Sequence, residues 1–128
     1  MGRQARTRLI CDHDRVHHWL DDVALPASWI DVRGRSTTDA KTRAGIAKEL
    51  RRELGRKHAL RPMSWQVAAM WRPQDDVLLA LDDGRAAIVH LTFALHPEPP
   101  PWPGTEIFPA LADLEAAFTE REELMGDD

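Results

Sequence analysis

The dipeptide Asp83-Gly84 constrains the fold of this chain more than any other sequence feature. It separates two stretches, residues 77–82 and 85–95, that are rich in apolar side chains. Asp-Gly between two such stretches is a strong signal for a β-hairpin, because glycine readily adopts the left-handed backbone conformation that a tight turn needs. We therefore expect two antiparallel strands joined at this dipeptide.

A two-residue turn at this dipeptide also predicts which side chains face each other. In that register Leu79 lies opposite Ile88, and Val77 lies opposite His90. Side chains alternate between the two faces of a strand, and here both faces carry apolar residues. We therefore expect both faces of the sheet to be covered by other parts of the protein.

Two further stretches have the pattern of strands. Residues 65–71 alternate so that every second residue from Trp65 to Trp71 would lie on one apolar face. A short fourth strand is expected near residues 29–33, where aromatic and β-branched residues precede a glycine. These stretches extend the hairpin to a meander of three to four antiparallel strands.

Helical periodicity gives three more elements. Apolar residues recur at intervals of three and four in residues 12–23, 39–54 and 108–124, as on one face of an amphipathic helix. In the second of these helices, Glu49 and Glu53 are expected to lie with the basic residues on the solvated side. The prediction is thus an α+β fold, a three- to four-stranded antiparallel meander packed with about three helices.

Length and composition predict one domain over residues 1–128. The chain has 128 residues, of which 43% are hydrophobic and 30% are charged, and this is enough to bury a core without disulfide bonds. Within the domain we expect a loose basic arm at residues 1–9, a stiff proline-rich strap at residues 97–105 and a frayed tail at residues 125–128.

Cysteine usage and hydropathy bear on the cellular compartment. Cys11 is the one cysteine, which argues against a disulfide framework and against a cysteine-based zinc site. The sequence has no apolar run long enough to span a membrane, and its start lacks the apolar stretch of a secretory signal. We therefore expect a cytoplasmic protein that has no membrane partner and no cofactor.

The second half of the chain carries a recognisable order of motifs. The hairpin continues into His90-Leu91-Thr92-Phe93, and the strap contains Trp102, Pro103 and Thr105 before Phe108. This order resembles a segment of small bacterial proteins of unassigned function, in which a His-Leu-Thr-Trp-like run precedes a Trp-Pro-x-Thr strap and a C-terminal helix. Phe93 stands where those proteins carry a tryptophan. The resemblance covers about a third of the chain and implies a domain type but no activity.

Charge is divided unevenly along the chain. Residues 1–72 carry 15 Lys/Arg against 8 Asp/Glu, whereas residues 73–128 carry 2 against 13. The basic charge is densest at residues 41–61, where Arg51 and Arg52 are candidate binding residues for nucleic acid or another anionic partner. Alternatively, the basic helix lies near the acidic C-terminal helix and the two charges partly cancel.

A histidine cluster near the N-terminus is a candidate metal site. His13 and His17 are one helical turn apart, so that both could bind one metal ion. A third ligand for a metal-assisted hydrolase would have to come from far along the chain, and it could be His58, His90, His96 or Glu98. The alternative is that these histidines simply face water on the polar side of a helix.

A second group of polar residues surrounds the end of the hairpin and the strap. Its members are candidate binding residues, and they are His90, Thr92, Trp102, Thr105 and Glu106. A histidine beside a glutamate could act as a general base near neutral pH. The alternative is structural, with His90 packed against the neighbouring strand and the other residues fastening the strap.

These motifs do not contain a complete catalytic set, so an enzyme is the less favoured hypothesis. We expect a small cytoplasmic binding or interaction protein that acts through charged surfaces on another protein, by analogy with inhibitors or immunity proteins. The alternatives are the metal-assisted hydrolase and a nucleic-acid binder using residues 41–61. The strand at residues 65–71 is a candidate open edge, so the protein is expected to be a monomer or a homodimer.

Overall fold

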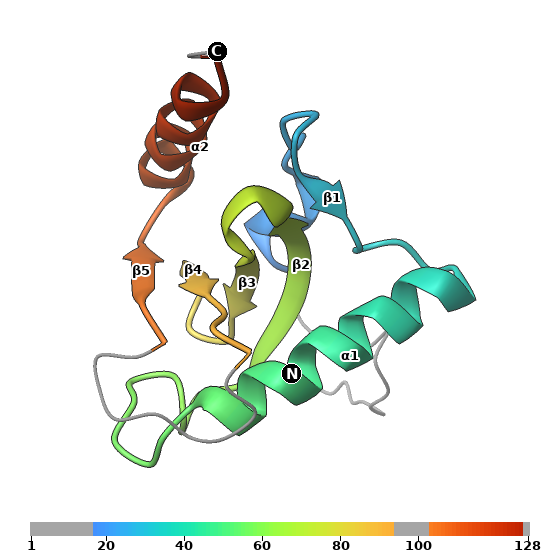
Figure 1. Ribbon diagram of the computed structural model, residues 1–128, viewed down its shortest axis with the longest axis vertical. Helices are drawn as coiled ribbons and strands as arrows, with labels where there is room; N and C mark the ends of the chain where they lie inside the picture. Colours follow the sequence, from blue (N-terminus) through green and yellow to red (C-terminus); the bar gives the residue numbers. More distant parts are fainter. Residues whose placement is uncertain (1–16, 94–102, 127–128) are drawn as a thin grey trace, which may run out of the picture.

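A five-stranded antiparallel sheet and two α-helices form the part of the chain that the computed structural model describes, residues 17–93 and 103–126 (Figure 1). The strands follow one another across the sheet in chain order, as in a meander. The elements are η3 (Trp19–Asp22), β1 (Ile30–Asp31), α1 (Thr37–Glu53), β2 (Trp65–Trp71), η4 (Arg72–Gln74), β3 (Asp76–Leu81), β4 (Ala86–His90), β5 (Thr105–Phe108) and α2 (Leu111–Gly126), where η denotes a 3-10 helix.

The α+β class with an antiparallel sheet is confirmed, but the predicted number of elements is wrong. The described residues contain five strands rather than three to four, and two α-helices rather than about three. The helix predicted at residues 12–23 is, in its described part, only the short η3, which His18 caps through a hydrogen bond from the Leu20 amide. Residues 12–16 lie outside the described residues.

The hairpin is confirmed, but its predicted register is wrong by one residue. The Leu81 amide donates to the Arg85 carbonyl at 2.9 Å, which leaves a loop of three residues, 82–84, rather than two. Gly84 takes the left-handed conformation in this loop, with φ at 93°. Three-residue hairpin loops use a glycine at this position, so the Asp-Gly signal also fits the longer loop.

The one-residue shift moves every side chain of β4 to the other face of the sheet. Val77 now lies opposite Val89 rather than His90, and Leu78 lies opposite Ile88. A hydrophobic cluster on one face contains Val77 and Val89, and a second cluster on the other face contains Leu78 and Ile88. Because the side-chain period of a strand is two residues, a slip of one residue exchanges the faces.

A β-bulge in β2 overturns the second pattern prediction. The register against β3 shifts between Val67 and Ala69, so the alternation of side chains breaks at Ala68. Val67 therefore belongs to the cluster beneath α1, whereas Ala69 and Trp71 belong to the cluster on the opposite face. A bulge inserts one extra residue into a strand, and an alternating sequence gives no sign of where it will occur.

The two helices cover opposite faces of the sheet, as the two apolar faces of the hairpin predict. Leu50 and Leu54, at the C-terminal end of α1, pack in one cluster. Leu114 and Phe118 of α2 pack in the other, where the ring of Phe118 meets Trp29 edge-on at 5.4 Å. Figure 1 shows the sheet between the two helices. The basic and acidic helices therefore do not cancel one another by direct contact.

The ends of the helices differ from their predicted bounds. α1 begins at Thr37 because the Ser36 hydroxyl caps it, accepting a hydrogen bond from the Asp39 amide at 3.0 Å. α2 begins at Leu111 rather than at residue 108. The helix continues to Gly126, so the tail predicted to fray from residue 125 is helical at its start.

The last strand, β5, was not predicted. Thr105 was expected at the end of the proline-rich strap, but it lies opposite Val89 in β4, and Phe108 lies opposite Ala86. β5 is an edge strand with β4 on one side, which is where a sequence next to prolines can join a sheet. Most of the predicted strap, residues 97–102, lies outside the described residues, as does the predicted arm at residues 1–9.

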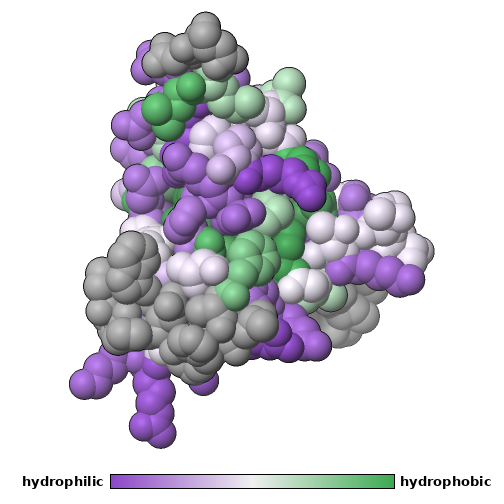
Figure 2. Space-filling view, in the orientation of Figure 1, coloured by the Kyte–Doolittle hydropathy of each residue, from purple (hydrophilic) through white to green (hydrophobic). Residues whose placement is uncertain are grey.

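The surface is mixed in character. In the space-filling view, apolar side chains reach the surface in the middle of the molecule, and hydrophilic side chains cover much of the rest (Figure 2). Within residues 17–93 and 103–126, no helix is long and apolar enough to cross a membrane.

Gly84 and Gly45 provide a matched pair of substitutions. Gly84→Ala should lower the free energy of unfolding by about 1 kcal/mol, because an L side chain is strained at positive φ. Gly45→Ala should raise it by about 0.5–1 kcal/mol, because Gly45 is inside α1 and a methyl group there meets open space. Urea denaturation of both variants measures the two changes. Equal changes of the same sign would contradict the assigned turn.

Candidate functional site

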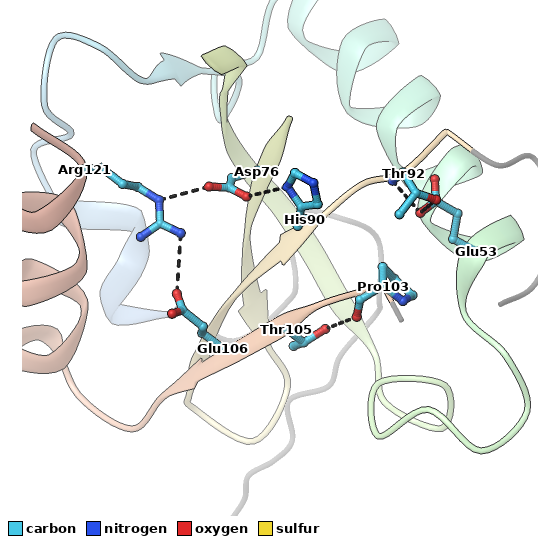
Figure 3. Close-up of polar contacts among 8 residues, drawn as sticks. All are labelled: Glu53, Asp76, His90, Thr92, Pro103, Thr105, Glu106 and Arg121. Carbon is cyan, nitrogen blue, oxygen red and sulfur yellow. Dashed lines mark hydrogen bonds and ion pairs between the residues drawn. The ribbon is translucent and has the colours of Figure 1, made fainter. Parts of the chain in front are cut away.

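Glu53 is a buried carboxylate that joins α1 to the chain just after β4. Its side chain is 0% exposed, which overturns the prediction that Glu53 faces water. The carboxylate accepts hydrogen bonds from the amide and hydroxyl of Thr92, at 2.9 and 3.0 Å (Figure 3). It also accepts one from the Phe93 amide at 2.7 Å. Phe93 has a positive φ of 57°, so these bonds hold the backbone in an unfavourable conformation.

The surroundings of Glu53 lower its pKa. Burial alone would raise the pKa, but hydrogen bonds outweigh it: one with the side chain of Glu49, and those from Thr92 and Phe93. Glu49 is itself buried, so it was also wrongly predicted to be solvated, and its carboxylate lies 3.6 Å from the Arg52 guanidinium. Glu49 and Glu53 therefore bond to neighbouring groups of the protein rather than to water.

A second buried carboxylate, Asp76, joins β3 to β4 and α2. Asp76 is 2% exposed, and it accepts a hydrogen bond from Arg121 Nε at 3.0 Å. Its other oxygen lies 3.3 Å from His90 Nδ1, and Arg121 also reaches Glu106 at 3.4 Å (Figure 3). The Arg121 guanidinium lies over the ring of Trp71, 5.6 Å from its centre.

This network orients a histidine but contains no nucleophile. The His90 side chain is 46% exposed, and Asp76 fixes the direction of its ring, as an acid does for a catalytic histidine. The four members, Asp76, His90, Glu106 and Arg121, include no hydroxyl or thiol. The network is best described as an ion pair that fastens α2 to the sheet.

The polar residues predicted around the hairpin and strap do not form one site. His90 and Glu106 belong to the Asp76 network, whereas Thr92 turns to Glu53 of α1 (Figure 3). Thr105 donates its hydroxyl to the Pro103 carbonyl at 2.9 Å and lies 3.1 Å from His58 Nε2. β4 ends at His90, so its side chain and that of Thr92 do not share a strand face. Trp102 lies outside the described residues.

The predicted metal pair is described only in part. His17 Nε2 lies 2.8 Å from an Asp22 carboxylate oxygen, and the His17 side chain is exposed. His13 lies outside the described residues, as do the candidate third ligands His96 and Glu98. The part of the chain that the structure describes contains no group of three His, Cys, Asp or Glu side chains that could hold a metal ion.

A cavity of about 410 Å³ opens where the end of α1 meets the start of β2. We call it the basic pocket, and its lining residues are Arg51, Leu54, Arg61, Met63, Ser64, Trp65 and Gln66. The Arg51 guanidinium lies over the ring of Trp65, 5.1 Å from its centre. Arg61 donates a hydrogen bond to the Leu54 carbonyl, which directs its side chain along the pocket wall.

Sequence reasoning found one of the residues that give this pocket its character. Arg51 was a predicted binding residue, but its predicted companion Arg52 does not line the cavity. Arg61 was counted in the basic stretch without being singled out, and Trp65 was assigned only to a strand face. Arg51, Arg61 and Trp65 are close in the sequence, and a short irregular segment connects the end of α1 to the start of β2. This short separation is the sequence signal that could have indicated that the three side chains lie together.

Glu53→Gln should destabilise the protein by about 2–3 kcal/mol at pH 7, because an amide cannot accept all of the hydrogen bonds that the carboxylate accepts. The lowered pKa means that this stabilisation is complete above the ordinary carboxyl pKa of 4.5 and is lost as pH falls through the lowered value. In urea denaturation from pH 7 to pH 3, the free energies of unfolding of the wild-type protein and of Glu53→Gln should therefore become equal in acid. A constant difference would rule out the lowered pKa.

Asp76→Asn should cost about 3 kcal/mol of unfolding free energy, because it leaves the buried Arg121 guanidinium without its main counter-charge. His90→Ala serves as the control on the other side of the same carboxylate. That change should cost less than about 1 kcal/mol, because His90 is half-exposed. Thermal or urea denaturation compares the two variants. A larger loss of unfolding free energy for His90→Ala than for Asp76→Asn would show that Arg121 is not the principal partner of Asp76.

Comparison of the chain with models of protein families, with curated proteins and with solved structures gave no match. The resemblance of residues 76–118 to small bacterial proteins thus stays a prediction. The geometry of the chain itself is the basis for any functional conclusion.

Proposed function

We propose that this chain is a binding protein that recognises an acidic group of a partner protein in the basic pocket. The observation that carries the proposal is the lining of the cavity, in which two arginines and a tryptophan meet. Arginine binds carboxylates through paired hydrogen bonds, and tryptophan offers a large apolar surface beside them. Arginine and tryptophan are also the residues most often found at the energetic centres of protein interfaces.

The contact between Arg51 and Trp65 supports this proposal. The indole face holds the guanidinium before any partner arrives, so less side-chain entropy is lost on binding. The planar group keeps its edges available for hydrogen bonds with a carboxylate. Arg61, directed by its bond to Leu54, adds a second cation to the same cavity.

The distribution of charge supports an acidic partner. Further exposed basic residues lie on α1 and on the segment after it, close in the sequence to the residues that line the pocket, and they include Lys48, Arg52, Arg56 and Lys57. The exposed acids of α2, among them Glu115, Glu122 and Glu123, belong to the helix on the other face of the sheet. α1 and the segment after it thus carry exposed basic residues and no exposed acid, which favours an acidic partner although the Asp82 carboxylate accepts a hydrogen bond from the Ser64 amide at the pocket and the whole chain has a formal net charge of −4.

A protein that works in this way acts by occupying a surface of its partner, as inhibitors and immunity proteins do. A nucleic-acid strand is the alternative partner, because a base can stack on tryptophan and its phosphates can bind arginine. The carboxylate partner is favoured because the cavity holds one aromatic ring rather than a row of them.

Arg51→Glu tests the proposal, with Lys48→Glu as the matched control. Both residues are exposed on α1 and the change of charge is the same, but only Arg51 lines the pocket. We expect Arg51→Glu to weaken binding of a fluorescein-labelled acidic heptapeptide, Glu-Val-Glu-Thr-Glu-Val-Glu, by roughly tenfold or more. Lys48→Glu should weaken it by no more than about threefold. Fluorescence anisotropy measures both.

Salt and a second probe complete the experiment. Binding of the wild-type protein should weaken between about 50 mM and about 500 mM NaCl, because charges are screened. A labelled single strand of oligothymidine is measured in parallel. Tighter binding of the oligonucleotide, or equal effects of the two substitutions on the peptide, would contradict the proposal.

A further inference from the structure

The outer edge of β2 is only partly covered by its neighbour β1. β1 has two residues, which lie opposite Met70 and Ala69, and the Val32 amide then donates to the Ala68 carbonyl at 3.1 Å. After Val32 the chain leaves the sheet toward α1. Within residues 17–93 and 103–126, no strand pairs with the Trp65–Val67 stretch on this side.

The backbone groups of Trp65 and Val67 point toward this open edge. The Asp82 amide donates to the Ser64 carbonyl at 3.0 Å, so these two residues, just outside β3 and β2, form a hydrogen-bonded pair that continues the ladder between the two strands. In an antiparallel pair, hydrogen-bonded and non-hydrogen-bonded positions alternate. Gln66 therefore also bonds to β3, whereas the amides and carbonyls of Trp65 and Val67 are directed away from it.

The basic pocket lies at the same end of β2. Trp65 and Gln66 of the uncovered stretch line the cavity, together with Ser64 just before the strand. Leu54, Met63 and Trp65 also line it, and they belong to or pack against the cluster beneath α1. The cavity therefore borders the uncovered end of β2 on the α1 side of the sheet.

We propose that the Trp65–Val67 edge of β2 receives an extended acidic segment of a partner protein as an additional strand in line with β1. This inference rests on the proposed function and specifies the conformation of the bound segment. Backbone hydrogen bonds to Trp65 and Val67 would give affinity, and side chains on one face of the segment would meet the pocket. Arg51 and Arg61 select carboxylates there, and the ring of Trp65 packs against the methylene groups of the same acidic side chains.

The other edge of the sheet is less suited to this use. β5 is bounded by Pro103 and Pro109, and Glu106 lies in its middle. Prolines and charged side chains on an edge strand hinder the addition of another chain. The open part of β2 has neither within Trp65–Val67. The contrast between the two edges assigns the additional strand to β2.

Hydrogen exchange of the backbone amides tests the added strand. In the ¹⁵N-labelled full chain, saturation with the unlabelled heptapeptide Glu-Val-Glu-Thr-Glu-Val-Glu should slow exchange of the Trp65 and Val67 amides by roughly tenfold or more, because they gain partners. The Gln66 amide is the internal control, since β3 already protects it, and it should change much less. A heptapeptide with N-methyl groups on every residue, which cannot donate hydrogen bonds, should bind at least roughly tenfold more weakly.

The outcomes separate this inference from the proposed function. If the heptapeptide binds and Arg51→Glu weakens it, but exchange at Trp65 and Val67 is unchanged, the added strand is wrong while the acidic partner stands. Equal binding of the N-methylated peptide would overturn the added strand in the same way. If neither peptide binds the wild-type protein, the proposed function itself falls.

Discussion

The register of the hairpin decides how the rest of this molecule is assembled. With Leu81 paired to Arg85, the apolar side chains of β3 and β4 divide into two matched faces, and each face takes one helix. The same register places Asp76 opposite His90, where Arg121 of α2 can reach it. A loop shorter by one residue would turn β4 over and separate these partners. One glycine at positive φ thus sets the arrangement of both helices.

Local patterns in the sequence predict the elements better than their pairing. The hairpin, β2 and α1 follow from residues that are neighbours in the chain, so alternation and helical periodicity find them. The bulge at Ala68 and the edge strand β5 depend on what lies across the sheet, and the sequence around them does not encode that. The apolar spacing near Trp19 fits a helix, but His18 hydrogen-bonds to Arg85 and the segment forms only a 3-10 turn.

The candidate site shows the same division. Arg51 could be predicted from charge alone, but the pocket needs Arg61 and Trp65, and the segment between α1 and β2 brings these three together. Buried charges are harder still to predict. Glu53 looks like a solvated helix residue until Thr92, far along the chain, is placed beside it. A sequence pattern records which residues are charged, and only the fold determines which of them lose contact with water.

The two helices on opposite faces carry exposed charges of opposite sign, basic on α1 and acidic on α2. The charges on the two faces therefore form an electric dipole directed across the sheet. In the field of the acidic partner proposed above, this dipole would give a torque that turns the α1 side forward before contact, and the acids of α2 would repel the partner from the opposite side. On that proposal the fold would select the orientation of an encounter at a distance, where shape has no influence.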